Sequence, residues 1–176
     1  MEIISVKITS VFETGAVKAK ANAVLGRFGV RGIKVCEGKS GLFVAMPSYK
    51  SAKGKYIDIF FPMDKEAKEE LAGAVLRAYA EKQAENALLS AGTDLSADVL
   101  KVGHHGSNTS TGAKLLAAVD PDYAILTCGV DNSYGHPHPD VVKRLQEAGV
   151  TLYRSDANGH IVITTDGDAL TFKTGK

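Results

Sequence analysis

The sequence predicts an α+β chain: an antiparallel sheet with one amphipathic helix, followed by a small α/β part of β-α-β-α-β order. Three patterns predict this division. Residues 2–61 alternate apolar and polar side chains in short runs separated by glycines, as strands do. From Asp64 onward, apolar residues recur at helical spacing. Residues 98–172 alternate short apolar runs with helical segments, which favours a partly parallel sheet with crossover helices.

The first part is expected to form an antiparallel meander, because its strands follow one another across short turns. In the opening run, EIISVKITSVF, Ile4, Val6 and Ile8 fall on one face of a strand. A polar, basic loop, SYKSAKGK, precedes the last strand. The expected strands are residues 2–12, 16–25, 27–35 with glycines interrupting it, 42–46 and 56–61.

A single helix is expected to close the first part. Asp64 is suited to cap it, since a carboxylate accepts hydrogen bonds from the free N–H groups of a first turn. Leu71, Val75 and Tyr79 recur at helical spacing and would face the sheet. The periodicity fades after Leu89. We therefore divide the chain into a first domain at 1–83, a connecting segment at 84–97 and a second domain at 98–176.

The second part is expected to contain βαβ units with right-handed crossovers. Ser107, Thr109 or Ser110 could cap its first helix, and His138 or Asp140 its second. The expected strands are residues 98–102, 123–128, 150–153, 160–164 and 169–172, and the expected helices are residues 109–119 and 138–148.

Composition excludes a wholly disordered chain, with 44% hydrophobic and 23% charged residues. No apolar run approaches the ~18 residues that cross a bilayer, and Met1–Ser10 lacks the pattern of a signal peptide. We therefore expect a cytoplasmic protein that does not bind membranes. Cys36 and Cys128 are then expected to be reduced residues of the core.

Basic residues concentrate at the start of the chain. Residues 1–61 carry ten lysines and arginines against four acids, whereas residues 86–176 carry seven against ten. Cations on loops and strands can contact phosphates, and Tyr49 and Tyr56 beside them can stack on bases. The alternative is a lysine-rich surface that only keeps the sheet soluble and protects its edges. The candidate phosphate contacts are Lys18 and Lys20, on one face of a strand, with Arg27, Arg31, Lys50, Lys53 and Lys55.

One run of the first part carries a family resemblance. GLFVAMPS at residues 41–48 is followed by a basic loop, an Asp-Ile strand, a proline and the helix that begins with Asp64. With the opening MEIISVKI, this pattern closely resembles the SpoVG family of septation proteins and DNA- and RNA-binding regulators. The resemblance covers nearly all of residues 1–83 and implies a homodimer of small sheets that binds nucleic acid without catalysis. Tyr49-Lys50 departs from it, because many relatives have two adjacent basic residues there.

Histidines occur only in the second part, and four of them lie in two motifs that each follow an apolar strand, KVGHHGS and NSYGHPHP. The carboxyl ends of neighbouring parallel strands lie at one edge of a sheet, so these imidazoles could converge on one crevice and bind Zn or Mn. Hydrogen bonds to strand-end carbonyls and helix capping by His138 are the structural alternatives. The candidate ligands are His104, His105, His136 and His138, with Asp98 and Asp131 as nearby carboxylates.

These motifs, with LQEAGVTLYRSD, resemble the C-terminal portion of the metallo-β-lactamase-fold domain of ComEC-type competence proteins, over roughly residues 95–165. In that family His-His-Gly-Ser supplies a late metal ligand, while an earlier HxHxDH-like motif and a further acid hold most of the metal. No histidine precedes His104 here, so the first ligands and the half of the β-sandwich that carries them are missing. No catalytic residue, cofactor or complete hydrolytic centre is therefore predicted. The isolated half-sheet would expose apolar surface unless another part of the chain or a second copy covers it.

The sequence thus predicts a nucleic-acid-binding regulator of the SpoVG type, linked to septation and sporulation. Its expected partners are DNA or RNA and a second copy of the chain. A metal-dependent hydrolase or nuclease remnant that uses the histidines is the alternative. A module that contacts the division machinery through protein partners is a third hypothesis.

Overall fold

The structure is a computed structural model that describes residues 3–176. The chain separates into two compact units, Met1–Asn86 and Ala87–Lys176. Glu2, the expected first residue of the first strand, lies outside the described residues. In the described part of the chain, no helix combines the length and the apolar character needed to cross a bilayer.

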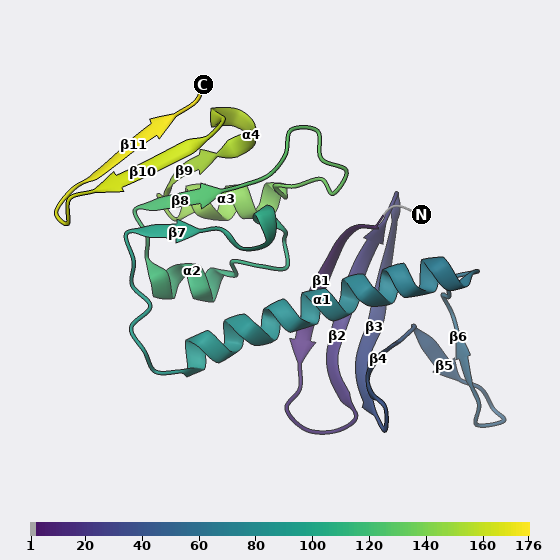
Figure 1. Cartoon of the computed structure of the whole chain (residues 1–176). Helices are drawn as coiled ribbons and strands as arrows, with labels where there is room; N and C mark the ends of the chain where they lie inside the picture. Colours follow the sequence, from purple (N-terminus) through teal and green to yellow (C-terminus); the bar gives the residue numbers. More distant parts are fainter. Residues whose placement is uncertain (1–2) are drawn as a thin grey trace. The chain divides into compact units, whose positions relative to one another are not determined.

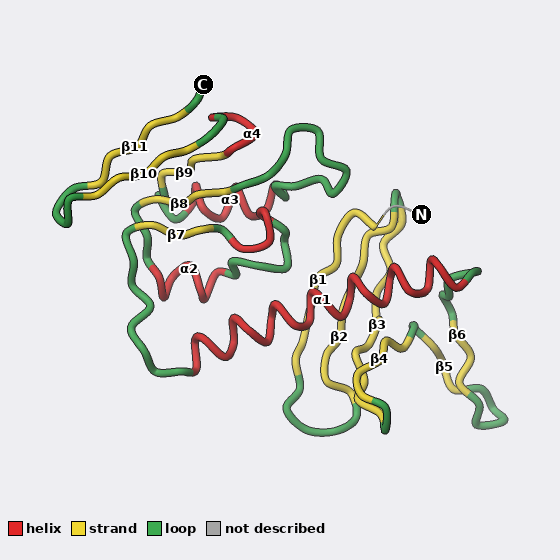
Figure 2. Tube along the Cα trace, viewed as in Figure 1, coloured by secondary structure: helices red, strands yellow, loops and turns green. Residues whose placement is uncertain are grey.

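The first unit is built on an antiparallel sheet whose strands keep their sequence order (Figures 1 and 2). This order confirms the predicted meander. Alternation along the strands places Val6, Ala21 and Ile33 on the face that carries the core. The strands are β1 (Ile3–Val11), β2 (Val17–Leu25), β3 (Phe28–Gly38) and β4 (Gly41–Ala45).

β3 is one long strand, and the prediction of an interrupted strand at residues 27–35 was wrong. Its register against β2 shifts between Val30 and Ile33, where β3 accommodates one extra residue as a β-bulge. Gly32 has a φ of 81° there, a backbone conformation that other residues rarely adopt. The glycines therefore bend the strand without ending it.

The basic loop after Pro47 is itself part of a small hairpin. β5 (Ser48–Lys50) pairs with β6 (Tyr56–Asp58) in a two-stranded sheet separate from the four-stranded one. β6 ends at Asp58 and not at residue 61 as predicted, because β5 offers only three residues for pairing. Beyond it the chain bends, and the Ile59 N–H donates to the Pro47 carbonyl at 2.7 Å.

α1 (Lys65–Ser90) covers one face of the four-stranded sheet (Figure 1). The Asp64 carboxylate accepts a hydrogen bond from the Ala67 N–H at 2.8 Å, which confirms the predicted cap. The helix runs into the predicted connecting segment, because residues 84–90 contain no helix breaker and the next glycine is Gly92. The buried apolar side chains of α1 are Leu71, Val75, Ala78 and Tyr79.

The second unit contains a parallel three-stranded sheet in the order β7-β8-β9, with helices connecting the strands as predicted. Side chains of α2 and α3 pack with Ala124 and Leu126 of the central strand. The elements are β7 (Val99–Lys101), the 3₁₀ turn η1 (Gly103–Gly106), α2 (Ala113–Val119), β8 (Tyr123–Leu126), α3 (Pro139–Glu147), β9 (Thr151–Arg154), α4 (Ser155–Asn158), β10 (Ile161–Thr165) and β11 (Leu170–Thr174).

The two longer helices of this unit begin differently. His138 caps α3, because its Nδ1 accepts a hydrogen bond from the Asp140 N–H at 3.2 Å. α2 begins at Ala113, four residues later than predicted, and no side chain caps it. The Ser110 hydroxyl donates instead to the Gly103 carbonyl at 2.7 Å. This polar run therefore belongs to the loop after β7.

The hairpin of β10 and β11 packs on the face of the three-stranded sheet that points away from α2 and α3. The ring of Phe172 in β11 stacks on Tyr153, with 4.7 Å between the centroids. It also lies 4.4 Å from the ring centroid of Tyr123. The unit therefore supplies its own second layer over part of the sheet that was expected to be exposed. Both cysteines are free, and Cys36 is buried while Cys128 is partly buried.

Candidate functional site

Lys18 and Lys20 do not share a face of β2, contrary to the prediction. The register of β2 against β3 shifts at residues 17–19. The Lys18 ammonium lies 2.8 Å from the Glu37 carboxylate, and its pKa is raised by the hydrogen bond with Glu37 and, to a lesser degree, by Tyr79 of α1. Lys18 therefore lies toward the α1 side. Because its charge is already paired, it is a weaker candidate for a phosphate contact than an unpaired lysine.

The face of the four-stranded sheet that points away from α1, here named the open face, carries three lysines. Lys20 and Lys34 are direct partners across β2 and β3, and both neighbours of each are fully buried on the other face. Lys7 of β1 alternates with core residues in the same way. The Lys20 ammonium also lies 5.8 Å from the ring centroid of Phe12. Among residues 3–176, no acidic side chain forms an ion pair with these lysines. The positive charges of Lys20 and Lys34 therefore lie directly opposite each other without compensation, which destabilises a sheet.

Lys7 and Lys34 are not among the seven predicted contacts. Each lies between two apolar residues of a strand, and this alternation could have placed both on a solvent-facing side. The pairing of Lys34 with Lys20 could not be predicted, because it depends on where the β-bulges fall.

Arg27 and Arg31 are both exposed. Arg27 lies in the turn between β2 and β3, and Arg31 lies in the β-bulge of β3. Neither forms an ion pair with an acidic group in the part of the chain that the structure describes. A guanidinium can bind a phosphate through two parallel hydrogen bonds, so both remain available for that contact.

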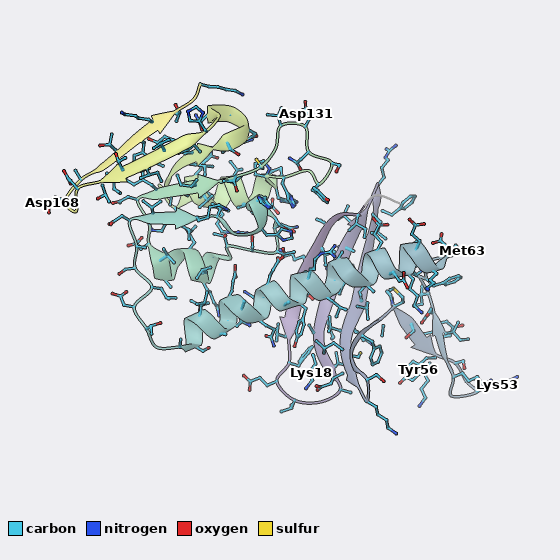
Figure 3. The ribbon with its side chains drawn as sticks, in the orientation of Figure 1. Lys18, Lys53, Tyr56, Met63, Asp131 and Asp168 are labelled. Carbon is cyan, nitrogen blue, oxygen red and sulfur yellow. The ribbon has the colours of Figure 1, made fainter. Side chains whose placement is uncertain are left out.

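The hairpin of β5 and β6, here named the basic hairpin, presents lysines and tyrosines together. Lys50, Lys53 and Lys55 are all exposed, and the exposed fractions of Tyr49 and Tyr56 are 52% and 71%. Figure 3 shows Lys53 at the outer end of the hairpin. Lys50 is the cross-strand partner of Tyr56. Proteins that bind single-stranded nucleic acids present solvent-exposed aromatic rings beside cations, because the bases stack on the rings and the cations contact the phosphates.

An apolar segment follows the basic hairpin. Ile59, Phe61 and Met63 are exposed by 69%, 55% and 85%, and Met63 projects at the start of α1 in Figure 3. Beside them lies a cavity of about 200 Å³ whose lining includes Phe60 and Leu71. Three large apolar side chains exposed within five residues are typical of an association surface.

In the second unit, the two histidine motifs meet beyond the carboxyl ends of β7 and β8. The ring centroids of His104 and His136 are 5.6 Å apart, and those of His104 and His105 are 6.4 Å apart. Tyr134 stacks on His136 with 6.0 Å between centroids. The predicted histidines thus lie close together, with an aromatic ring that the sequence reasoning did not single out.

Two of these histidines bond to the backbone. His105 Nδ1 lies 2.6 Å from the Thr127 carbonyl oxygen, which can only accept, so Nδ1 carries the proton and donates. His138 Nδ1 accepts from the Asp140 N–H, so its proton lies on Nε2. The Asp140 carboxylate lies 3.7 Å from the same Nδ1 atom.

The imidazole of His136 is half-buried. Burial lowers its pKa, and the nearby imidazoles of His104, His105 and His138 lower the pKa further, since like charges disfavour one another. Nδ1 of His136 is buried and has no hydrogen-bond partner among the described residues.

The predicted carboxylates do not join the histidines. Asp98 precedes β7, at the amino end of the strand, whereas His104 follows its carboxyl end. Asp131 is exposed and lies at the outer end of the loop after β8 in Figure 3. Within residues 3–176, no three His, Cys, Asp or Glu side chains are arranged to hold a metal ion. A catalytic zinc centre uses three protein ligands, so these residues do not fit the metal that the metallo-β-lactamase resemblance implies.

The first unit matches a known family over its whole sheet and most of α1. The sequence profile of SpoVG matches residues 1–81. The protein named "Putative septation protein SpoVG" of Archaeoglobus fulgidus is 41% identical over 83 residues, which are 47% of this chain and 98% of that protein. The chain belongs to the SpoVG family. The open face, the basic hairpin and the apolar segment all lie within the residues that match SpoVG.

Two further relatives are much longer than this SpoVG chain. ComE operon protein 3 of Bacillus subtilis is 42% identical over 81 residues, or 46% of this chain. Competence protein ComA of Neisseria gonorrhoeae is 44% identical over 68 residues, or 39% of this chain. The chain spans only 10% of the length of either relative. The similarity therefore concerns a short piece of each.

Proposed function

We propose that this chain is a nucleic-acid-binding regulator of the SpoVG type, and that it holds DNA or RNA on the basic hairpin and the open face. One observation carries the proposal: the hairpin places three exposed lysines beside two exposed tyrosines. Lysines neutralise phosphates, and tyrosine rings stack on unpaired bases. The combination favours single strands over duplexes, whose bases are already stacked.

The open face supports the same proposal. Lys20 and Lys34 face each other across two strands without an acidic partner among the described residues. A phosphate held between them would relieve their repulsion and gain charge-assisted hydrogen bonds. We infer from the name of the SpoVG relatives that such binding acts in the control of septation.

Binding by the full chain should depend steeply on salt. With five to seven phosphate contacts, the slope of log affinity against log salt for a single strand should be about −3 to −5. Fluorescence anisotropy with labelled single-stranded DNA and RNA of about 20 nucleotides, long enough for such a surface, measures it. Absence of binding at low salt would contradict the proposal, and tighter binding to duplexes would contradict the role of the tyrosines.

We further propose a homodimer that forms through the apolar segment of Ile59, Phe61 and Met63. The exposure of these side chains and the cavity beside them support this, because a large apolar side chain from a second copy would fill the space.

Phe61→Asp should weaken this dimer by about 100-fold, because it removes apolar burial worth about 2 kcal/mol and places a charge in the contact. Sedimentation equilibrium of the full chain measures the monomer–dimer equilibrium. Val162→Asp is the matched control, since Val162 is also an exposed apolar residue but lies in the second unit. Equal behaviour of the two variants would exclude the apolar segment as the contact.

We propose that the matches to the two long relatives fall on the second unit, because KVGHHGS and YGHPHP carry the ComEC-type resemblance there. A metal-dependent hydrolase or nuclease is not favoured, since no three His, Cys, Asp or Glu side chains of the described residues are arranged to hold a metal ion. We therefore assign no catalytic step to this unit.

A further inference from the structure

The metallo-β-lactamase resemblance implies that imidazoles of the second unit bind a metal ion. In His138, however, no nitrogen lone pair is left to bind such an ion. A neutral imidazole offers a single lone pair. In His138 that pair, at Nδ1, accepts the Asp140 N–H at 3.2 Å and caps α3. Binding a metal at either nitrogen would require His138 to lose this cap.

The remaining imidazoles do not form a ligand set either. His105 donates from Nδ1 to the Thr127 carbonyl, which leaves one lone pair at Nε2. His136 Nδ1 is buried without a partner among the described residues, whereas a histidine ligand almost always has its second nitrogen hydrogen-bonded. No carboxylate joins them to complete a group of three in the described chain.

Direct hydrogen bonds already hold the two histidine loops together. The His138 N–H donates to the Gly106 carbonyl at 2.8 Å. Asn132 bonds both the N–H and the carbonyl of His136 through its side-chain amide. From α3, Arg144 donates to the Thr111 carbonyl at 2.8 Å. The bonds of His138 and Arg144 join the loop after β7 to the start of α3 and to α3 itself, and the bonds of Asn132 fix the shape of the loop before α3.

Apolar and aromatic side chains pack on the sheet in the rest of the unit. The helices α2 and α3 share one apolar core with the sheet. On the other side, Phe172 of β11 packs on Tyr123 and Tyr153. One face of the three-stranded sheet and part of the other are thus covered by residues of the same unit.

We infer that the histidine loops of the second unit form a metal-independent junction, in which His105 and His138 act as structural hydrogen-bonding residues and no metal ion contributes to the fold. This inference does not rest on nucleic-acid binding by the first unit.

Metal analysis of the untagged full chain tests the inference. After dialysis against chelator-free buffer, inductively coupled plasma mass spectrometry should find far less than one zinc or manganese per chain. The Tm should stay within about 1 °C on addition of EDTA or of one equivalent of Zn, because a ligand that does not favour the native state does not move the Tm. A stoichiometric metal, or a fall of several degrees with EDTA, would overturn the inference.

Substitution of His138 separates a cap from a ligand. His138→Ala should lower the Tm by a few degrees, since alanine cannot cap, whereas His138→Asn should retain most of the Tm of the parent chain because asparagine is among the best caps. Both variants should respond to EDTA and Zn as the parent does. If His138→Asn lost as much Tm as His138→Ala, the role of His138 as a cap would be refuted.

Discussion

Replacing Lys50, Lys53 and Lys55 together with glutamine should weaken nucleic-acid binding by about 10- to 100-fold at low salt. These lysines are exposed on the basic hairpin next to Tyr49 and Tyr56, where they can approach a phosphate backbone while bases stack on the rings. Loss of three phosphate contacts should also make the salt slope shallower by about 2. Anisotropy titrations of the full-length variant at several salt concentrations measure both effects.

A matched variant distinguishes a local contact from net charge. Lys114, Lys143 and Lys173 are exposed lysines of the second unit, and their replacement by glutamine changes the net charge by the same amount. This variant should bind within about twofold of the parent chain, because non-contacting charges act only through a screened field. If both triple variants lost affinity equally, the hairpin would not be the binding surface.

Gly106→Ala should destabilise the second unit by about 2–5 kcal/mol. Gly106 has a φ of 79°, and a Cβ at this position would lie 2.8 Å from the Leu126 side chain and 2.9 Å from Cβ of Pro137. The substitution therefore combines left-handed backbone strain with a clash where the two histidine loops meet. Urea unfolding followed by circular dichroism, with hydrogen exchange to locate the loss in residues 87–176, measures the effect.

Gly135→Ala separates these two causes. Gly135 also has a positive φ, of 65°, but no atom lies within 4 Å of a Cβ placed there. This variant should lose only about 1–2 kcal/mol, the cost of a left-handed non-glycine residue. Equal losses for the two variants would show that the histidine loops are not packed against each other at Gly106.

Most of the fold of the first unit could be predicted, because it follows from short-range pattern. Alternating apolar residues indicated the strands, and the carboxylate of Asp64 marked the start of α1. One error came where strand pairing decides, since β6 stops at Asp58 because its partner is short. The other came from local sequence: α1 continues to Ser90, although its apolar periodicity fades, because no residue breaks the helix earlier.

The candidate nucleic-acid site was predicted in its composition and only partly in its geometry. The lysines and tyrosines of the basic hairpin were indicated by their density in one loop. A two-residue spacing suggested that Lys18 accompanies Lys20, but the β-bulge of β2 and the Glu37 carboxylate separate them. Lys34 joins Lys20 only through the register of β3 against β2.

Local chemistry along the chain was thus sufficient to establish where strands and helices form, where cations gather and that the histidines follow two neighbouring strands. Their partners emerged only from contacts between distant residues. The bond from His105 to Thr127 joins residues 22 positions apart, and Phe172 reaches Tyr123 from the last strand. Such contacts determine which lone pairs and which charges stay available. They depend on β-bulges and packing in three dimensions, which no short window of sequence specifies.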